Sequence, residues 1–130
     1  MGNSVLLLDS NKESLTSISE ILELSGYNVI ALEKNQDVLN IINTVRPEVI
    51  LIDLKIRDND GLQLAYELKQ YPELNTIPII GIIDYYLSRV PFKLINFFGI
   101  THYLLRPFNP LDLIGKIESA LNNSGKGVGV

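Results

Sequence analysis

The feature that most constrains this chain is a short apolar run, residues 49–54, that contains one carboxylate, Asp53. A run this short and apolar is typical of a strand buried on both faces, as in the middle of a parallel sheet. A carboxylate in the sheet layer is costly unless it lies at the strand's end with partners, and loop residues 57–61 follow soon after. We therefore expect Asp53 to end a central strand, where open α/β sheets place their ligand sites. An aspartate that only caps a helix or a turn is the alternative.

Composition excludes several classes of function. The length of 130 residues suits one domain, and 46% hydrophobic residues can fill its core. A net charge of −4 without a basic run argues against direct binding to nucleic acid or to an anionic membrane. The chain has no cysteine and one histidine, His102, which argues against thiolate or histidine metal clusters and a Ser-His-Asp triad. Without a membrane-spanning run or a signal-peptide pattern, we expect a soluble, cytoplasmic protein.

Strand and helix patterns alternate along the chain, with short apolar runs predicting strands and apolar positions at helical spacing predicting helices. The predicted strands are residues 5–9, 27–32, 49–53, 77–83 and 103–105. The predicted helices are residues 12–25, 36–45, 61–70, a crossover helix within 84–99 that Pro91 interrupts, and a last helix capped by Asn109. Ser10 or Asn11 can cap the first helix. This alternation predicts a doubly wound α/β domain over residues 1–122, and the glycine-rich residues 123–130 predict a flexible tail or the start of a linker.

Three features together resemble the receiver domain of two-component response regulators. They are the acidic strand ends, the loop from Arg57 to Gly61, and the Arg106-Pro107-Phe108 turn. The resemblance covers about residues 4–122 and implies a flavodoxin-like fold with the sheet order 2-1-3-4-5. It also implies a phosphoacceptor signalling domain and not an enzyme. Asp53 would accept a phosphoryl group from a histidine kinase or a phosphotransfer protein.

The resemblance assigns further residues. Asp9 matches the first of two acidic residues that help to hold Mg²⁺, and Lys55 would give the metal a backbone carbonyl. Tyr103 matches the aromatic residue on the fifth strand that often reports activation. The face formed by the fourth helix, fifth strand and fifth helix is implied as the surface for an output partner, a fused domain or a second copy of the chain.

Three departures from the family bear on the site. Ser10 stands where the family has a second acidic residue, so we expect weak Mg²⁺ binding. Ile83 stands where a serine or threonine ends the fourth strand, and it lacks the hydroxyl that approaches the phosphoryl group. Asp84 replaces the small residue that follows. It would repel an incoming phosphoryl group at the pocket mouth, or it caps the next helix in solvent.

A fourth departure is Arg106, which replaces the family's lysine before the proline. A guanidinium keeps the positive charge and binds carboxylates with two parallel hydrogen bonds. We expect a cis Arg106-Pro107 bond that directs Arg106 toward Asp53. Arg106 would then act as a built-in counter-ion for that carboxylate.

Other side chains have simpler interpretations. His102 is expected to be an exposed loop residue before the fifth strand. Aromatic residues gather between positions 85 and 98, where part of them should fill the core and the rest form an exposed apolar patch for a partner. They are Tyr85, Tyr86, Phe92, Phe97 and Phe98.

Three functions remain open. In the first, Asp53 with Mg²⁺ accepts phosphate and signals to a partner, which the retained Asp9 favours. The second is an interaction module that binds partners without a phosphate switch, which Ser10, Ile83 and Asp84 favour. The third is a flavin or nucleotide binder, but the loop after the first predicted strand is acidic and has no glycine-rich phosphate cradle. We therefore predict a receiver domain in phosphorelay signalling whose phosphorylation is inefficient.

Overall fold

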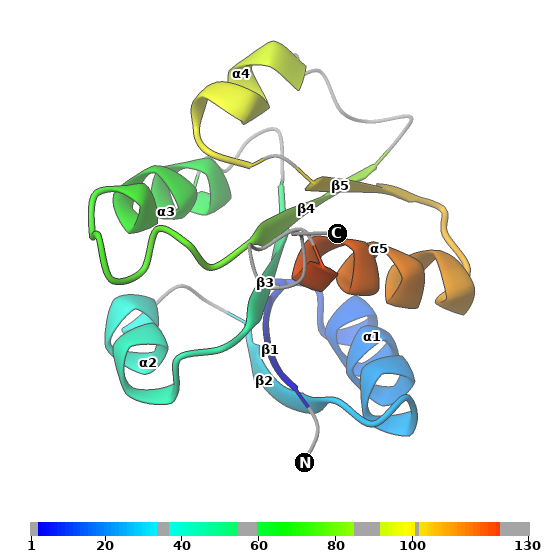
Figure 1. Ribbon diagram of the computed structural model, residues 1–130. Helices are drawn as coiled ribbons and strands as arrows, with labels where there is room; N and C mark the ends of the chain where they lie inside the picture. Colours follow the sequence, from blue (N-terminus) through cyan, green and yellow to red (C-terminus); the bar gives the residue numbers. More distant parts are fainter. Residues whose placement is uncertain (1–2, 34–36, 55–59, 85–91, 101, 123–130) are drawn as a thin grey trace.

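The computed structural model describes residues 3–33, 37–54, 60–84, 92–100 and 102–122, and it shows a parallel sheet between two layers of helices (Figure 1). The strands are β1 (Ser4–Leu8), β2 (Asn28–Leu32), β3 (Val49–Asp53), β4 (Ile79–Asp84) and β5 (His102–Arg106). The helices are α1 (Lys12–Leu24), α2 (Val38–Val45), α3 (Asp60–Lys69), α4 (Phe92–Phe97) and α5 (Pro110–Asn122).

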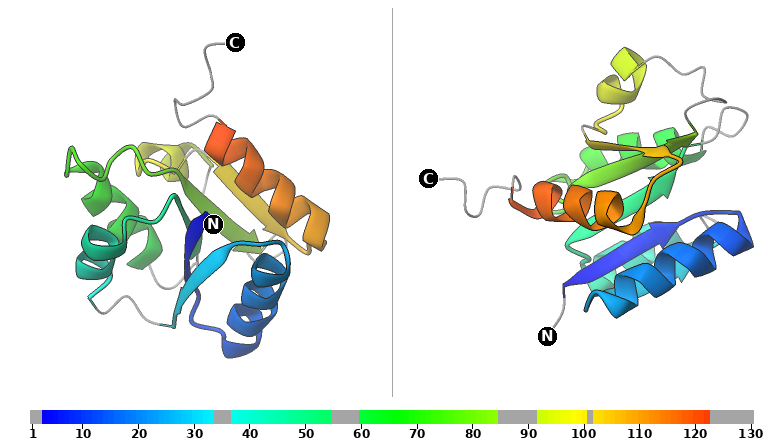
Figure 2. Two further views of the ribbon diagram at one scale, coloured as in Figure 1. Left: turned by 60° about the horizontal axis from the view of Figure 1, so that its bottom comes forward. Right: turned by 90° about the vertical axis from the view of Figure 1, so that its right-hand side faces the viewer.

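The sheet has the predicted order. The strands follow one another as β2-β1-β3-β4-β5, and each neighbouring pair is parallel. Parallel neighbours require crossover helices, which here cover both faces of the sheet (Figure 2). The doubly wound α/β fold is therefore confirmed, whereas the expected tail, residues 123–130, lies outside the described residues.

Side-chain alternation along the strands divides the core into two layers. In β3, Ile50 and Ile52 pack in the cluster that includes residues of α2, α3 and α4, whereas Val49 and Leu51 pack in the cluster that includes residues of α1 and α5. Successive side chains of a strand point to opposite faces. All four side chains are buried, which explains why this strand reads as an unbroken apolar run.

The helix ends follow from short-range hydrogen bonds. Asn11, and not Ser10, caps α1, because its side-chain oxygen accepts a hydrogen bond from the Ser14 amide at 2.9 Å. At α5, the side chain of Asn109 accepts from the Asp112 amide at 2.8 Å, and the side chain of Asp112 accepts from the Asn109 amide at 3.1 Å. This reciprocal pair forms a capping box and confirms Asn109 as the predicted cap.

Apart from one-residue shifts at β1 and β2, the bounds of β4 and β5 differ from the sequence-based expectation. β4 begins at Ile79 and continues to Asp84, so it lies later in the chain than the predicted 77–83. β5 begins at His102, which is partly buried and is not the exposed loop residue that the sequence suggested. Burial, together with the nearby Lys116, lowers the pKa of the His102 imidazole.

The crossover between β4 and β5 contains α4, which begins directly after Pro91 in the sequence and spans six residues. Phe97 is 73% exposed, whereas Phe98 packs against the core. Tyr85 and Tyr86 lie outside the described residues. Within the described ranges, no helix has the length and apolarity needed to cross a membrane.

Candidate functional site

Four charged side chains meet at the carboxyl edge of the sheet. Asp9 follows β1, and Asp53, Asp84 and Arg106 are the last residues of β3, β4 and β5. The residue before each of the three aspartates packs toward α2, α3 and α4. Strand alternation therefore turns the three carboxylates to the other face, toward α1 and α5. In this way the parallel sheet brings residues almost one hundred positions apart into one cluster.

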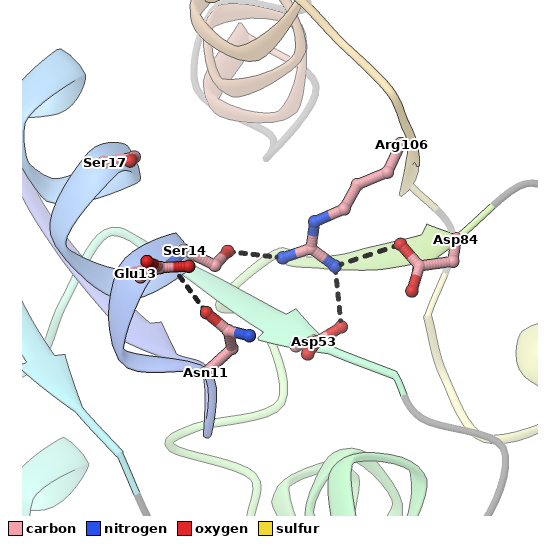
Figure 3. A pocket seen from close by; sticks show the side chains of 7 residues that line it. All are labelled: Asn11, Glu13, Ser14, Ser17, Asp53, Asp84 and Arg106. Carbon is pink, nitrogen blue, oxygen red and sulfur yellow. Dashed lines mark hydrogen bonds and ion pairs between the residues drawn. The ribbon is translucent and has the colours of Figure 1, made fainter.

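Arg106 is the centre of this cluster (Figure 3). Its Nη1 donates to Asp53 Oδ1 at 3.0 Å and lies 3.6 Å from Asp84 Oδ1. Its Nη2 donates to Asp9 Oδ2 at 3.1 Å. Because one planar guanidinium contacts both Asp9 and Asp53, the two carboxylates lie close together at the carboxyl edge of the sheet. The Arg106-Pro107 bond is cis, as predicted.

Sequence reasoning missed Ser14. The Ser14 hydroxyl lies 2.6 Å from Arg106 Nη2 and accepts a hydrogen bond from it. Asn11 caps the helix that carries Ser14, and the Asn11 amide donates to Asp9 Oδ1 at 2.9 Å. The signal was available in the sequence, since a helix that starts right after the acidic strand end must place its first turn beside that edge. Nothing in the sequence, however, distinguishes a serine in that turn that contacts the site from one that does not.

The cluster borders an open pocket of about 410 Å³. The first turns of α1 form one wall, and the strand ends form the other (Figure 3). The lining residues are Asn11, Glu13, Ser14, Ser17, Asp53, Asp84 and Arg106. A polar pocket with a carboxylate and a guanidinium side by side suits a charged group more than an apolar ligand.

Burial differs strongly among the four charged groups. The side chains of Asp9 and Asp53 are 0% and 7% exposed, whereas Arg106 is 23% and Asp84 is 43% exposed. Burial raises the pKa of the Asp53 carboxyl, the Arg106 guanidinium lowers it, and the neighbouring Asp9 raises it again, with a net upward shift. Asp53 is thus a carboxylate whose charge is disfavoured in the folded state, as is common at functional sites.

This shift predicts a pH-dependent cost to stability. An unfolded Asp53 loses its proton near its ordinary pKa of 3.8, whereas the folded protein keeps that proton to higher pH. The folded state therefore binds more protons in this window, and the Asp53 contribution to stability falls as pH rises from 3.8 through the raised folded pKa.

Urea unfolding at a series of pH values tests this expectation in the wild type and in Asp53→Asn. The free energy of unfolding of the variant minus that of the wild type should increase with pH across this window and then level off. The control is Glu23→Gln, which removes an exposed carboxylate of α1. A difference for Asp53→Asn that does not change with pH would contradict the raised pKa.

Ile83, which stands at the family's serine or threonine position, lies on the core side of β4. Ile83 is buried in the core cluster that includes residues of α2, α3 and α4, so it points away from the Asp53 pocket. The pocket-facing residue at the end of β4 is Asp84, which is paired with Arg106 in the register of the sheet. Asp84 was expected either at the pocket mouth or as a helix cap in solvent. Its contact with Arg106 supports the pocket position.

The remaining predicted residues fall in different places. Ser10 is exposed, and α1 contributes Ser14 and Glu13 to the pocket wall instead. Lys55 lies outside the described residues. Tyr103 packs against the core on the far face of the sheet, and its hydroxyl donates a hydrogen bond to the side chain of Asn96 in α4. Burial raises the pKa of the Tyr103 phenol.

The donor set fits Mg²⁺ poorly. Mg²⁺ is usually held by one or two carboxylates together with water, and Asp9 and Asp53 are the residues that would supply them. Both already accept hydrogen bonds from the Arg106 guanidinium. In the described part of the chain, no three His, Cys, Asp or Glu side chains are arranged to hold a metal ion.

Comparison with known proteins agrees with this geometry. The model of the response regulator receiver domain family matches residues 5–118. The chain is 26% identical to the phosphate regulon transcriptional regulatory protein PhoB of Pseudomonas aeruginosa, covering 98% of this chain and 55% of PhoB. It is also 26% identical to the polar-differentiation response regulator DivK of Brucella anthropi, covering 95% of this chain and all of DivK (100%). The chain thus spans about half the length of PhoB.

Solved structures show the same fold. The Vibrio cholerae chemotaxis protein CheY4 superposes with a TM-score of 0.82 at 22% identity, covering 93% of this chain and 100% of CheY4. A response regulator from Chloroflexus aurantiacus superposes with the same TM-score of 0.82 at 23% identity, covering 93% of this chain and 98% of the other. Both structures share the receiver architecture of a parallel sheet with helices on its two faces. With the family model covering nearly the whole described chain, the acidic strand ends have their explanation: this chain belongs to the response regulator receiver domain family, the signalling domains of two-component systems.

Proposed function

We propose that this domain acts in a phosphorelay, where Asp53 accepts a phosphoryl group from a histidine kinase or a phosphotransfer protein. The observation that carries the proposal is the placement of Asp53 at the edge of the sheet, beside a pocket and in direct contact with a cation, Arg106. Phosphoryl transfer depends mainly on positioning and on neutralising the charge of the transferred group. For such a role we propose a cytoplasmic location.

The chemistry needs one nucleophile and one cation. A carboxylate oxygen of Asp53 attacks the phosphorus of a phosphohistidine. The new P–O bond forms while the P–N bond breaks, and the leaving imidazole takes up a proton from solvent. Arg106 keeps its place beside Asp53 and compensates for the negative charge of the acyl phosphate, as guanidinium groups do in phosphate sites.

Receiver domains typically bind Mg²⁺ at the acidic site, and we propose that this chain binds it weakly. Ser10 contributes no charge, and Asp9 and Asp53 are engaged by Arg106. No step of the proposed transfer depends on the metal. Phosphorylation should therefore be slow and should respond little to added Mg²⁺.

We place the output contact on the face formed by α4, β5 and α5. Phe97 and Leu111 are 73% and 81% exposed there, and Tyr103, Leu105 and Phe108 line a groove of about 520 Å³ between β5 and α5. Exposed apolar patches are typical of protein contacts. PhoB, a transcriptional regulatory protein, is longer than this chain, whereas DivK is matched over its whole length. The contact would serve an output partner, a fused domain or a second copy of the chain.

The direct test is incubation with a small phosphodonor such as acetyl phosphate, followed by intact mass measurement. The wild type should slowly gain about 80 Da, one phosphoryl group, with and without Mg²⁺. The matched control is Asp53→Asn, which keeps the size of the side chain and should gain nothing. A gain of equal size in Asp53→Asn, or none in the wild type after prolonged incubation, would contradict Asp53 as the acceptor.

A second candidate function is an interaction module that binds partners without a phosphate switch. The observation that favours it is the carboxylate of Asp84 in the pocket, where it repels a phosphoryl group. Partner affinity decides between the two functions. Equal affinity of wild type and Asp53→Asn, with and without phosphodonor, supports the module. A tenfold gain with phosphodonor in the wild type alone, about 1.4 kcal/mol, supports the switching receiver.

A further inference from the structure

We propose that Arg106 is an internal competitor for divalent cations, so that this receiver carries its own cation in the place where the family binds a metal. The inference deepens the proposed phosphoacceptor role, because it rests on Asp9 and Asp53 as the acidic pair of that site. It goes beyond that role by explaining which residue keeps metal affinity low. The absence of a carboxylate at Ser10 is then the smaller cause of the low metal affinity.

The Arg106 guanidinium forms a fork between the two carboxylates. Nη1 and Nη2 of Arg106 each donate to a different carboxylate, at 3.0 Å to Asp53 and at 3.1 Å to Asp9. The guanidinium thus lies across the two groups that would supply the metal's charged ligands. A metal that binds these same two oxygens, Asp53 Oδ1 and Asp9 Oδ2, must displace the guanidinium, because two positive centres held by one pair of oxygens repel each other at short range.

Further acceptors hold the guanidinium in place. The Ser14 hydroxyl accepts from Nη2 at 2.6 Å, and Asp84 Oδ1 lies 3.6 Å from Nη1. Displacement of Arg106 therefore also breaks contacts to α1 and to β4. Asp9 and Asp53 are 0% and 7% exposed, so their pairing with Arg106 is little screened by water.

Arginine and lysine differ in how many carboxylates they can engage at this position. A lysine ammonium is a compact point charge, whereas the arginine fork presents donors in two directions at once. An ammonium at position 106 could neutralise Asp53 and still leave Asp9 open to a cation. The forked shape of the arginine, more than its positive charge, therefore keeps metal ions from binding both carboxylates.

Binding of Mn²⁺ alone, measured by the electron paramagnetic resonance signal of the free ion and competed with Mg²⁺, tests the proposal without any phosphodonor. Arg106→Gln should bind Mn²⁺ at least tenfold more tightly than the wild type, and Arg106→Lys should show a smaller gain. The charge-matched control is Arg46→Gln, at the exposed end of α2, which should leave binding unchanged. Mg²⁺ should displace the bound Mn²⁺ from the variants.

Two results would overturn the proposal. One is unchanged Mn²⁺ binding in folded Arg106→Lys, which serves as the test even if Arg106→Gln does not fold. The other is a tenfold gain in Ser10→Asp with no gain in either Arg106 variant, which would make the missing carboxylate the whole cause. Because no phosphoryl transfer is measured, failure here leaves Asp53 as acceptor intact, and failure of the phosphodonor test leaves the metal competition intact.

Discussion

Replacing Arg106 with glutamine should lower the free energy of unfolding by about 2–4 kcal/mol at pH 7. The variant leaves Asp9 and Asp53 in the fold without their shared cation, and both carboxylates are almost fully buried. Removing one partner of a buried ion pair costs more than the pair itself contributes, because the remaining charge stays desolvated. The partial exposure of Arg106 keeps the expected loss below the upper end of such effects.

Urea unfolding of the metal-free protein measures this loss, and two variants serve as controls. Arg46→Gln removes an exposed guanidinium and should change stability by less than about 0.5 kcal/mol. In the double variant Arg106→Gln with Asp53→Asn, the loss relative to Asp53→Asn alone should be smaller, since one of the two stranded charges is gone. A loss below about 0.5 kcal/mol in Arg106→Gln would mean that water reaches the two carboxylates.

Asp84→Thr should increase the rate of phosphorylation of Asp53 by small phosphodonors about tenfold, equivalent to about 1.4 kcal/mol of the barrier. The carboxylate of Asp84 faces the same pocket and contacts the same guanidinium as Asp53. Its removal takes away a like charge from the path of the phosphoryl group and leaves Arg106 more available to it. Threonine also introduces a hydroxyl that can donate to a phosphoryl oxygen.

Asp84→Val separates the two causes, because it removes the charge without adding a donor. If repulsion dominates, both variants should gain alike, and if the hydroxyl dominates, only Asp84→Thr should gain. The initial rate of mass gain in acetyl phosphate gives the comparison, with Asp53→Asn in the same background as the blank. An unchanged rate in both variants would show that Asp84 does not influence the transfer.

The strand pattern predicted most of this fold because its signals are local. The apolar run before Asp53 is short, carries its carboxylate at the end, and needs no knowledge of the rest of the chain. Asn109 is similar, since a cap depends on residues within one helical turn. The sheet order and the cis bond before Pro107 came from the resemblance to receiver domains, and both are present in the structure.

The face that Ile83 takes could not be predicted from the sequence, for a physical reason. Side chains of a strand alternate, so a shift of one residue exchanges the pocket face and the core face. The resemblance put Ile83 at the family's serine or threonine position ending the fourth strand, whereas β4 extends to Asp84, and Asp84 is the residue opposite Arg106 in the register. Apolar residues occupy both faces of this buried strand, so composition held no information about which face Ile83 takes. Ser14 was missed because its role depends on a contact between α1 and β5.

The opposite placement of the pocket and Tyr103 has a mechanical consequence. Asp53 and Arg106 face α1 and α5, while the Tyr103 ring packs on the other side of the sheet and is tied to Asn96 of α4. We expect a signal from the pocket to reach Tyr103 through the backbone hydrogen bonds that pair β4 with β5, as strain in these bonds or as sliding of one strand along the other. Binding of a group in the pocket should therefore change the hydrogen-exchange rates of the backbone amides that pair β4 with β5.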